Sequence, residues 1–163
     1  AGMAVMVSSQ ENIQYMAGLM DAQMISYDKV NQLRQVRFLK DRTNTMELMQ
    51  RHAALLRPRF DVFLQELEQL RTLEIASWTQ PDGGYFIGLY TLPGCAKRTV
   101  ELCKQAGLIM TQAGATYPYG LDPQDHHIRI APSYPSLEEV KIAAKVFCTC
   151  LKLAALEKIL SSD

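Results

Sequence analysis

Residues 75–90, with the sequence IASWTQPDGGYFIGLY, decide which fold we expect. Residues 75–79 and 85–90 are typical of strands, because apolar, aromatic and β-branched side chains dominate them. The QPDG run at 80–83 is typical of a turn, since proline presets its own φ and glycine accepts a positive φ. We therefore expect a β-hairpin here.

The sequence after the hairpin predicts a helix, further strand segments and a long loop. Helix signals cover residues 94–106, and Gly107 stands where a glycine often ends a helix. Residues 108–110 are a candidate for a brief strand, and a loop rich in Gly, Pro and Tyr spans 111–125. Another strand is expected at 127–131.

The last helix has a clear start signal. Ser136 and Glu139 form a capping box, in which each side chain binds a backbone N–H that the helix leaves free. Apolar residues then follow at helical spacing to about Leu160. We expect one continuous helix over this stretch.

The residues that begin the chain predict a strand and two helices. The apolar run at 3–7 is consistent with a buried strand. Ser8 and Glu11 form a capping box before a helix expected over 9–21. A second, amphipathic helix is expected over 28–40.

A long helix is expected between these elements and the hairpin. Asn44 and Glu47 form a cap-like pair, and apolar residues follow at helical spacing to Leu70. Pro58 removes one backbone donor, so we expect it to kink this helix and not to end it. Together the elements predict an α+β fold, with a small, mostly antiparallel sheet packed on long helices.

The composition excludes several classes of protein. The chain has 163 residues, 48% of them hydrophobic, and its 17 basic and 17 acidic side chains cancel. This apolar content suffices for a core, whereas a nucleic-acid-binding protein is expected to be basic. No apolar run approaches the ~20 residues of a membrane span. No basic region precedes the first apolar stretch, as a signal peptide requires. We expect neither a nucleic-acid nor a membrane partner.

The four cysteines indicate a reducing compartment. Cys148 and Cys150 lie about 200° apart around a helix, and Cys95 and Cys103 lie about 12 Å apart along another, too far for a disulfide. Their spacing matches no zinc motif. Disulfides between the two helices stay possible, but nothing in the spacing favours them. We expect a cytoplasmic protein in which at least Cys148 or Cys150 is a buried, inert thiol.

The histidines, serines and glycines form no recognisable metal or catalytic site. His126 and His127 are adjacent, so they face opposite ways on a strand, and His52 has no partner at i+4. The chain contains neither a Gly-x-Ser-x-Gly elbow nor a phosphate-binding loop. We expect no metal, and the residues alone indicate no catalytic group.

Arg129 is the residue whose position leaves two interpretations open. On a strand over 127–131, Ile128 and Ile130 share one face and Arg129 takes the other. An arginine there is either a solvated charge on the wet face of the sheet or a planar fork aimed at a carboxylate.

Several motifs follow one another in a distinctive order. They are YDKVNQLRQVRF at 27–38, WTQPDGGYFIGL at 78–89, AGLI at 106–109, GATYP at 114–118, IRIAPS at 128–133 and SLEE at 136–139. Their succession, over nearly the whole chain, resembles the C-terminal small domain of fold-type I, pyridoxal-phosphate-dependent aminotransferases of class I/II. The resemblance is to an aspartate-aminotransferase-like branch.

The resemblance implies roles for three residues. Arg129 stands where that family holds the substrate α-carboxylate, and Phe86 matches an aromatic position that lines the substrate pocket. Gln23 falls where the family reaches toward the distal group of a substrate bound by a neighbouring subunit. The implied partners are an amino acid and a 2-oxo acid, and the implied assembly is a homodimer.

The resemblance also implies that catalytic groups are missing. The family needs a Schiff-base lysine in a Ser/Thr-rich phosphate cup and an acidic residue on the pyridinium nitrogen. None of the eight lysines here follows such a cup. We expect residues 1–25 to be a remnant strand and helix of the large cofactor-binding domain, 26–72 to be kinked linking helices, and 73–163 to be the small domain.

The chain begins with Ala1 and not with methionine, so we expect a piece of a longer protein. By itself it is expected neither to transaminate nor to hold pyridoxal phosphate. Residues 1–25 are expected to be mobile, misplaced or paired with another copy. The alternative is a carboxylate-binding or oligomerisation module without catalysis, since a fold alone does not establish activity.

Overall fold

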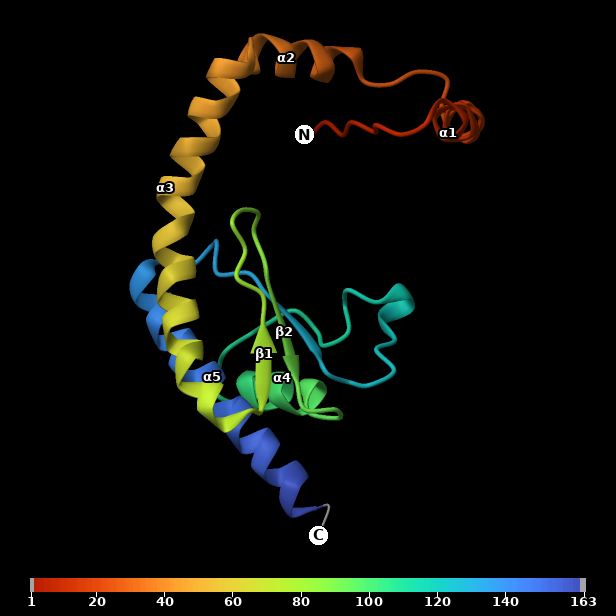
Figure 1. Cartoon of the computed structure of the whole chain (residues 1–163). Coiled ribbons are helices and arrows are strands. Elements are labelled where there is room, and N and C mark those ends of the chain that lie inside the picture. Colours follow the sequence, from red (N-terminus) through yellow and green to blue (C-terminus); the bar gives the residue numbers. More distant parts are fainter. Residues whose placement is uncertain (1, 162–163) are drawn as a thin grey trace. The chain divides into compact units, whose positions relative to one another are not determined.

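The computed structural model of the chain describes residues 2–161 (Figure 1), so Ala1 and residues 162–163, which the predicted domains include, lie outside it. The chain forms two compact units, and the division falls inside one helix, between Arg51 and His52. The division expected for the longer protein, after residues 25 and 72, stays a prediction.

The first unit is built from α1 (Gln10–Gln23), α2 (Lys29–Leu39) and the beginning of α3 (Arg42–Leu67). Both α1 and α2 lie where the sequence predicts helices. Ser9 and not Ser8 caps α1, because the Ser9 hydroxyl accepts the Asn12 N–H at 3.3 Å. The predicted capping box of Ser8 and Glu11 is therefore wrong by one residue.

The apolar run at residues 3–7 forms no strand, so that prediction is wrong. A strand needs a hydrogen-bonded neighbour, and no described segment pairs with this one. Its side chains are exposed, with Val5 at 78% and Val7 at 90% of full exposure. Continuous apolarity predicts burial, but it does not supply the neighbouring strand.

Helix α3 begins before its predicted cap. The Asp41 carboxylate accepts the Asn44 N–H at 2.9 Å, so Asp41 supplies the cap and Asn44 lies inside the helix. The predicted cap pair of Asn44 and Glu47 is therefore wrong. Pro58 lies within α3 and does not end it, as expected. The α-helix ends at Leu67, before the expected Leu70.

The second unit contains a three-stranded antiparallel sheet. Its strands are, in spatial order, β1 (Ala76–Trp78), β2 (Ile87–Thr91) and β3 (His127–Ile130). The predicted hairpin is confirmed, with Trp78 opposite Leu89. Strand β3 pairs with β2 and sets Arg129 opposite Gly88, while its other edge pairs with no strand of the described chain.

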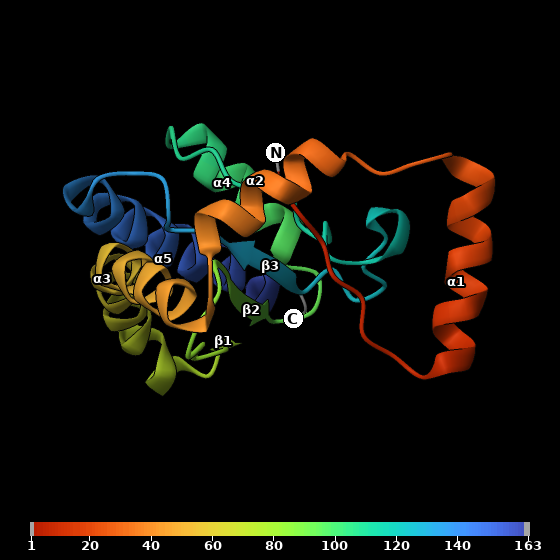
Figure 2. The same ribbon diagram turned by 90° about the horizontal axis from the view of Figure 1, so that it is seen from above.

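The remaining elements of the second unit are η1 (Glu68–Leu73), α4 (Ala96–Gln105), η2 (Pro118–Gly120) and α5 (Leu137–Leu160). Helix α5 and the second part of α3 lie side by side, as both Figure 1 and Figure 2 show, and Phe63 meets Phe147 between them at 5.7 Å. Ile128 and Ile130 are buried in the core that these helices share with the sheet. The expected α+β class is confirmed.

Helix α5 begins at the predicted capping box. The Glu139 N–H donates to the Ser136 hydroxyl at 3.3 Å, and the Ser136 N–H donates to the Glu139 carboxylate at 2.7 Å. After α4, Gly107 adopts a φ of +85°, as its helix-ending position predicts. Residues 108–110 form no strand, so that prediction is wrong.

The four cysteines are free and buried. Burial raises the pKa of Cys103 to about 12 and that of Cys148 to about 11, so both thiols are protonated at neutral pH. Over the part of the chain that the structure describes, no helix combines the length and apolarity needed to cross a bilayer.

Candidate carboxylate site

Arg129 presents a guanidinium for which the described residues leave a buried donor without an acceptor. Its side chain is half-buried, and its Nε is buried without a hydrogen bond to any described residue. A buried donor without an acceptor costs roughly 1–3 kcal/mol. Such an arrangement is expected where a ligand supplies the missing acceptor.

The Phe86 ring stacks against this guanidinium. The Arg129 Cζ lies 4.5 Å from the centre of the Phe86 ring, within cation–π distance. Stacking directs the N–H groups outward in the plane of the fork, where a carboxylate binds two of them at once. The structure thus brings together two of the three residues that the sequence predicts for substrate binding.

Arg71 shows what a satisfied arginine looks like in the same unit. It also lies over an aromatic ring, that of Trp78 at 5.1 Å. Its Nε and Nη2, however, donate to both carboxylate oxygens of Glu68 at 2.6 and 2.7 Å. Arg129 has the ring, but no carboxylate of a described residue accepts its Nε–H, which is the arrangement that the carboxylate-binding interpretation expects.

A cavity of about 170 Å³ adjoins Arg129, which forms part of its lining. Residues 108–111 line one wall, residues 129–132 line another, and Phe63, Pro135, Val140 and Ala143 complete it. Most of these side chains are apolar. Apolar walls lower the local dielectric, so an anion that reaches the guanidinium there is held more strongly than in water.

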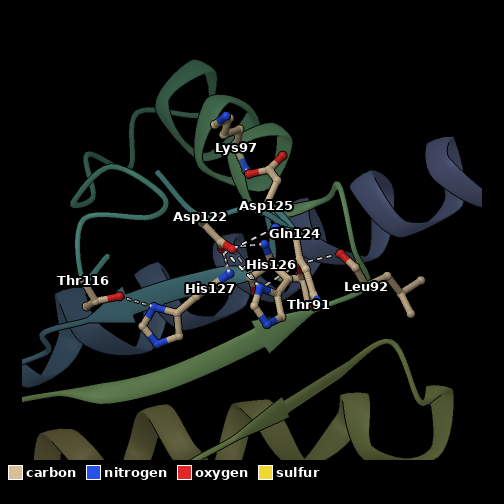
Figure 3. A network of polar contacts seen from close by, with 9 residues as sticks. All are labelled: Thr91, Leu92, Lys97, Thr116, Asp122, Gln124, Asp125, His126 and His127. Carbon is tan, nitrogen blue, oxygen red and sulfur yellow. Dashed lines mark hydrogen bonds and ion pairs between the residues drawn. The ribbon is translucent and has the colours of Figure 1, made fainter. Parts of the chain in front are cut away.

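Asp122 organises the chain just before β3 (Figure 3). Its carboxylate accepts the backbone N–H groups of Gln124 at 3.1 Å and of His126 and His127 at 2.8 Å each, and it also contacts the His126 Nδ1 at 3.1 Å. Burial alone would raise the pKa of Asp122, but these N–H groups outweigh it and hold the pKa far below its usual range. The carboxylate is therefore ionised at neutral pH.

His127 is fixed beside this carboxylate. Its Nδ1 lies 2.7 Å from the Thr116 hydroxyl, and its ring packs against Tyr90 at 4.8 Å and Tyr117 at 6.1 Å. Burial lowers the pKa of His127, so the imidazole is neutral at pH 7. Among the described residues, no group of three or more His, Cys, Asp or Glu side chains is placed to hold a metal.

Gln23 is predicted but lies outside this group of residues, and Asp122 belongs to the group but is not predicted. Gln23 is the last residue of α1 in the first unit, where it is exposed, and its role stays a prediction. Asp122 does not emerge from the sequence analysis. The signal that points to it is an Asp-Pro pair four residues before His126, typical of a turn that a carboxylate organises.

The family model described as "Aspartate amino-transferase" matches residues 1–163. The chain belongs to this aspartate amino-transferase family. A "putative aminotransferase" from Mycolicibacterium smegmatis is 45% identical over 98% of this chain and 38% of its own length. An aspartate aminotransferase from Corynebacterium glutamicum is 40% identical over 96% of this chain and 37% of its own length. The chain thus spans little more than a third of these relatives.

Solved structures of aminotransferases share the fold. An aspartate transaminase from Corynebacterium glutamicum superposes with a TM-score of 0.82, at 40% identity, over 93% of this chain and 36% of that one. An α-aminoadipate aminotransferase from Thermus thermophilus, complexed with N-(5'-phosphopyridoxyl)-L-leucine, gives 0.71 over 91% of this chain and 37% of that one. At 16% identity the latter shows the fold alone.

The aminotransferase family implies pyridoxal phosphate, and the described residues do not offer it a Schiff-base lysine. No lysine lines the cavity beside Arg129. Lys152 is half-buried and donates to Gln69 at 2.6 Å, and the other lysines are exposed. What the described residues offer beside this cavity is the Arg129 guanidinium, stacked on Phe86.

Proposed function

We propose that this chain is the C-terminal part of a pyridoxal-phosphate-dependent aminotransferase, and that Arg129 binds the α-carboxylate of its amino acid and 2-oxo acid substrates. The observation that carries the proposal is the Arg129 guanidinium, stacked on Phe86 with a buried Nε that has no acceptor among the described residues. Membership of the aspartate amino-transferase family supports it.

The chemistry divides between this chain and the rest of the protein. Pyridoxal phosphate would supply the electron sink that lets an amino group move between an amino acid and a 2-oxo acid. Arg129 would hold the substrate by two parallel N–H···O bonds and so fix the orientation of its Cα–H bond. Because its own lysines lie away from this fork, the chain alone is proposed to be inactive.

Three further features belong to the proposal. The protein acts as a homodimer in the cytoplasm, and Gln23 reaches toward the distal group of a substrate bound by the neighbouring subunit. The buried, protonated thiols suit a reducing compartment. Gel filtration tests the homodimer, and a Gln23→Ala variant, compared on substrates that differ only in their distal group, tests the role of Gln23.

The deciding experiment uses the longer protein mixed with pyridoxal phosphate. Its visible absorption spectrum is recorded before and after amino acids are added. A cofactor band that shifts to the pyridoxamine form is expected. A band that ignores amino acids, or no band, would instead favour a carboxylate-binding or oligomerisation module without catalysis.

Variants of Arg129 then test the residue itself. Arg129→Ala should raise KM strongly and lower kcat/KM by about 30-fold to several thousandfold, since losing one partner of a buried charge pair costs about 2–5 kcal/mol. Arg129→Lys should recover only part of the loss, because an ammonium is not a planar fork. Arg71→Lys is the matched control, since Arg71 also stacks on a ring but already binds Glu68. An unchanged KM in Arg129→Ala would refute this role.

A further inference from the structure

The main chain of Arg129 faces the open edge of β3. The Gly88 N–H donates to the Thr79 hydroxyl at 3.0 Å, and the Gly88 carbonyl accepts the Thr79 N–H at 2.9 Å. Directly opposed residues of an antiparallel pair exchange either both main-chain bonds or none. Because both groups of Gly88 turn toward Thr79, its partner Arg129 directs its own N–H and carbonyl away from β2.

Just before Arg129, the main-chain groups on this open edge form hydrogen bonds with a loop and not with a strand. Two residues earlier on the same edge, the His127 N–H donates to Asp122 at 2.8 Å and the His127 carbonyl accepts the Gly114 N–H at 3.2 Å. The His126 N–H donates to the same Asp122 oxygen at 2.8 Å. The Asp122 side chain, only 2% exposed, thus does for the start of β3 what a neighbouring strand would do (Figure 3).

Arg129 has no comparable anchor of its own. Its guanidinium lies over the Phe86 ring, its Nε has no hydrogen bond to a described residue, and its side of the strand lines a cavity in part. The position of the fork therefore depends on the main chain of β3, which pairing with β2 holds along the strand and Asp122 holds at its start. The His127 ring lies beside the residue that pairs with Arg129, since a Cβ added to Gly88 would stand 3.4 Å from the His127 Nε2.

We propose that Asp122 is a positioning residue for the carboxylate site. By accepting two N–H groups at the start of β3, it fixes the strand and thereby holds the Arg129 guanidinium over Phe86. That this guanidinium serves a substrate carboxylate rests on the proposed function, whereas the positioning itself does not.

Asp122→Asn and Asp125→Asn form a matched pair of variants. In Asp122→Asn one carboxylate oxygen becomes an amide nitrogen, which donates and cannot accept. Whichever way the amide turns, it cannot accept all three N–H groups, since Gln124 donates to one oxygen and His126 and His127 donate to the other. Asp125 lies in the same loop, but its carboxylate accepts the Lys97 N–H at the start of α4. Asparagine also tolerates the φ of +46° at residue 125.

The measurement is the Nε–H resonance of Arg129 in ¹⁵N-labelled protein, assigned by its loss in Arg129→Lys. Because the guanidinium stacks on Phe86, the resonance should be shifted upfield by the ring current. In Asp122→Asn it should move to the position of the exposed arginines, and in Asp125→Asn it should stay. An unmoved resonance in folded Asp122→Asn overturns the proposal. If that variant fails to fold, Asp122→Glu takes its place. The Arg129 resonance is then expected to shift partly, and no shift overturns the proposal.

A binding assay separates this inference from the proposed function. Maleate, a small dicarboxylate probe, should bind Asp122→Asn about 10–100-fold more weakly than wild type, as expected for a binding group moved by about 1 Å, and Asp125→Asn should bind it as wild type does. Unfolding curves establish that each variant is folded during the assay, so a loss of affinity is not a loss of fold. If maleate binds all three proteins equally, the proposal fails. If it does not bind wild type, the proposed function loses support while the resonance still decides the positioning.

Discussion

The Phe86 ring lies under the Arg129 guanidinium, with the Cζ 4.5 Å from the ring centre. Replacing it by alanine removes the cation–π contact and the platform, which should weaken carboxylate binding by about 0.5–2 kcal/mol, or about 2–30-fold. Phe86→Leu keeps apolar bulk and should recover part of the loss. Maleate titration, or KM in the longer protein, measures the effect. Tyr85→Ala removes the adjacent exposed ring and serves as the control. An equal loss of affinity in this variant would show that the contact of Phe86 with Arg129 does not contribute to carboxylate binding.

Some side chains of the site can be predicted from the sequence and others cannot. Arg129 and Phe86 lie in or beside strands, where alternation decides the face, and a motif order marks their places. Asp122 acts through backbone N–H groups in the irregular loop 111–125, which has no period to read. The Gly88 geometry is equally hidden, because it depends on the hydrogen bonds of the neighbouring strand.

Helix α5 depends on the capping box at its start. Ser136→Ala should lower the free energy of unfolding by about 0.5–2 kcal/mol, the usual cost of losing a serine cap, and a urea unfolding curve measures it. Ser9→Ala removes the corresponding cap of α1, which has no buried residues, and should leave the cooperative transition unchanged. Equal losses would mean that α1 belongs to the same cooperative unit.

The same cap gives a pH dependence of known sign. The Ser136 N–H lowers the pKa of Glu139 below its ordinary 4.5, so the folded state favours the carboxylate. The stabilisation from Glu139 is then fully present above that ordinary pKa and is lost as the pH falls through the folded-state pKa. In Glu139→Gln the free energy of unfolding should therefore fall less than in wild type as the pH is lowered.

The elements that the sequence predicts correctly are those whose signals are local. The hairpin has its turn residues, and α5 has both partners of its capping box within four residues. The runs at 3–7 and 108–110 fail for the opposite reason. A strand exists only with a neighbour, and apolar composition does not say whether one is present. Cap positions shift by a residue or more because several serines, asparagines and aspartates compete for them.

Over the full chain, the two units differ in what protects their backbones. Helices α1 and α2 have no buried residues, whereas α5 buries residues along its length, among them Val140, Phe147 and Leu151. Amides of α5 should therefore exchange hydrogen only on global unfolding, and those of α1 by local opening at almost no free-energy cost. The protection factors should differ by at least about 1,000-fold, the smallest ratio expected for a stable small domain.

Protein concentration should change this contrast. Leu33, Val36 and Phe38 of α2 are all largely exposed, and exposed apolar side chains on a helix favour association with a second copy. Exchange measured by mass spectrometry at several concentrations, with the monomer fraction from sedimentation, should show protection of α1 and α2 that rises with association while that of α5 stays constant. If α1 is as protected as α5 in a verified monomer, residues 1–25 form a stable structure of their own, and their expected dependence on another surface is wrong.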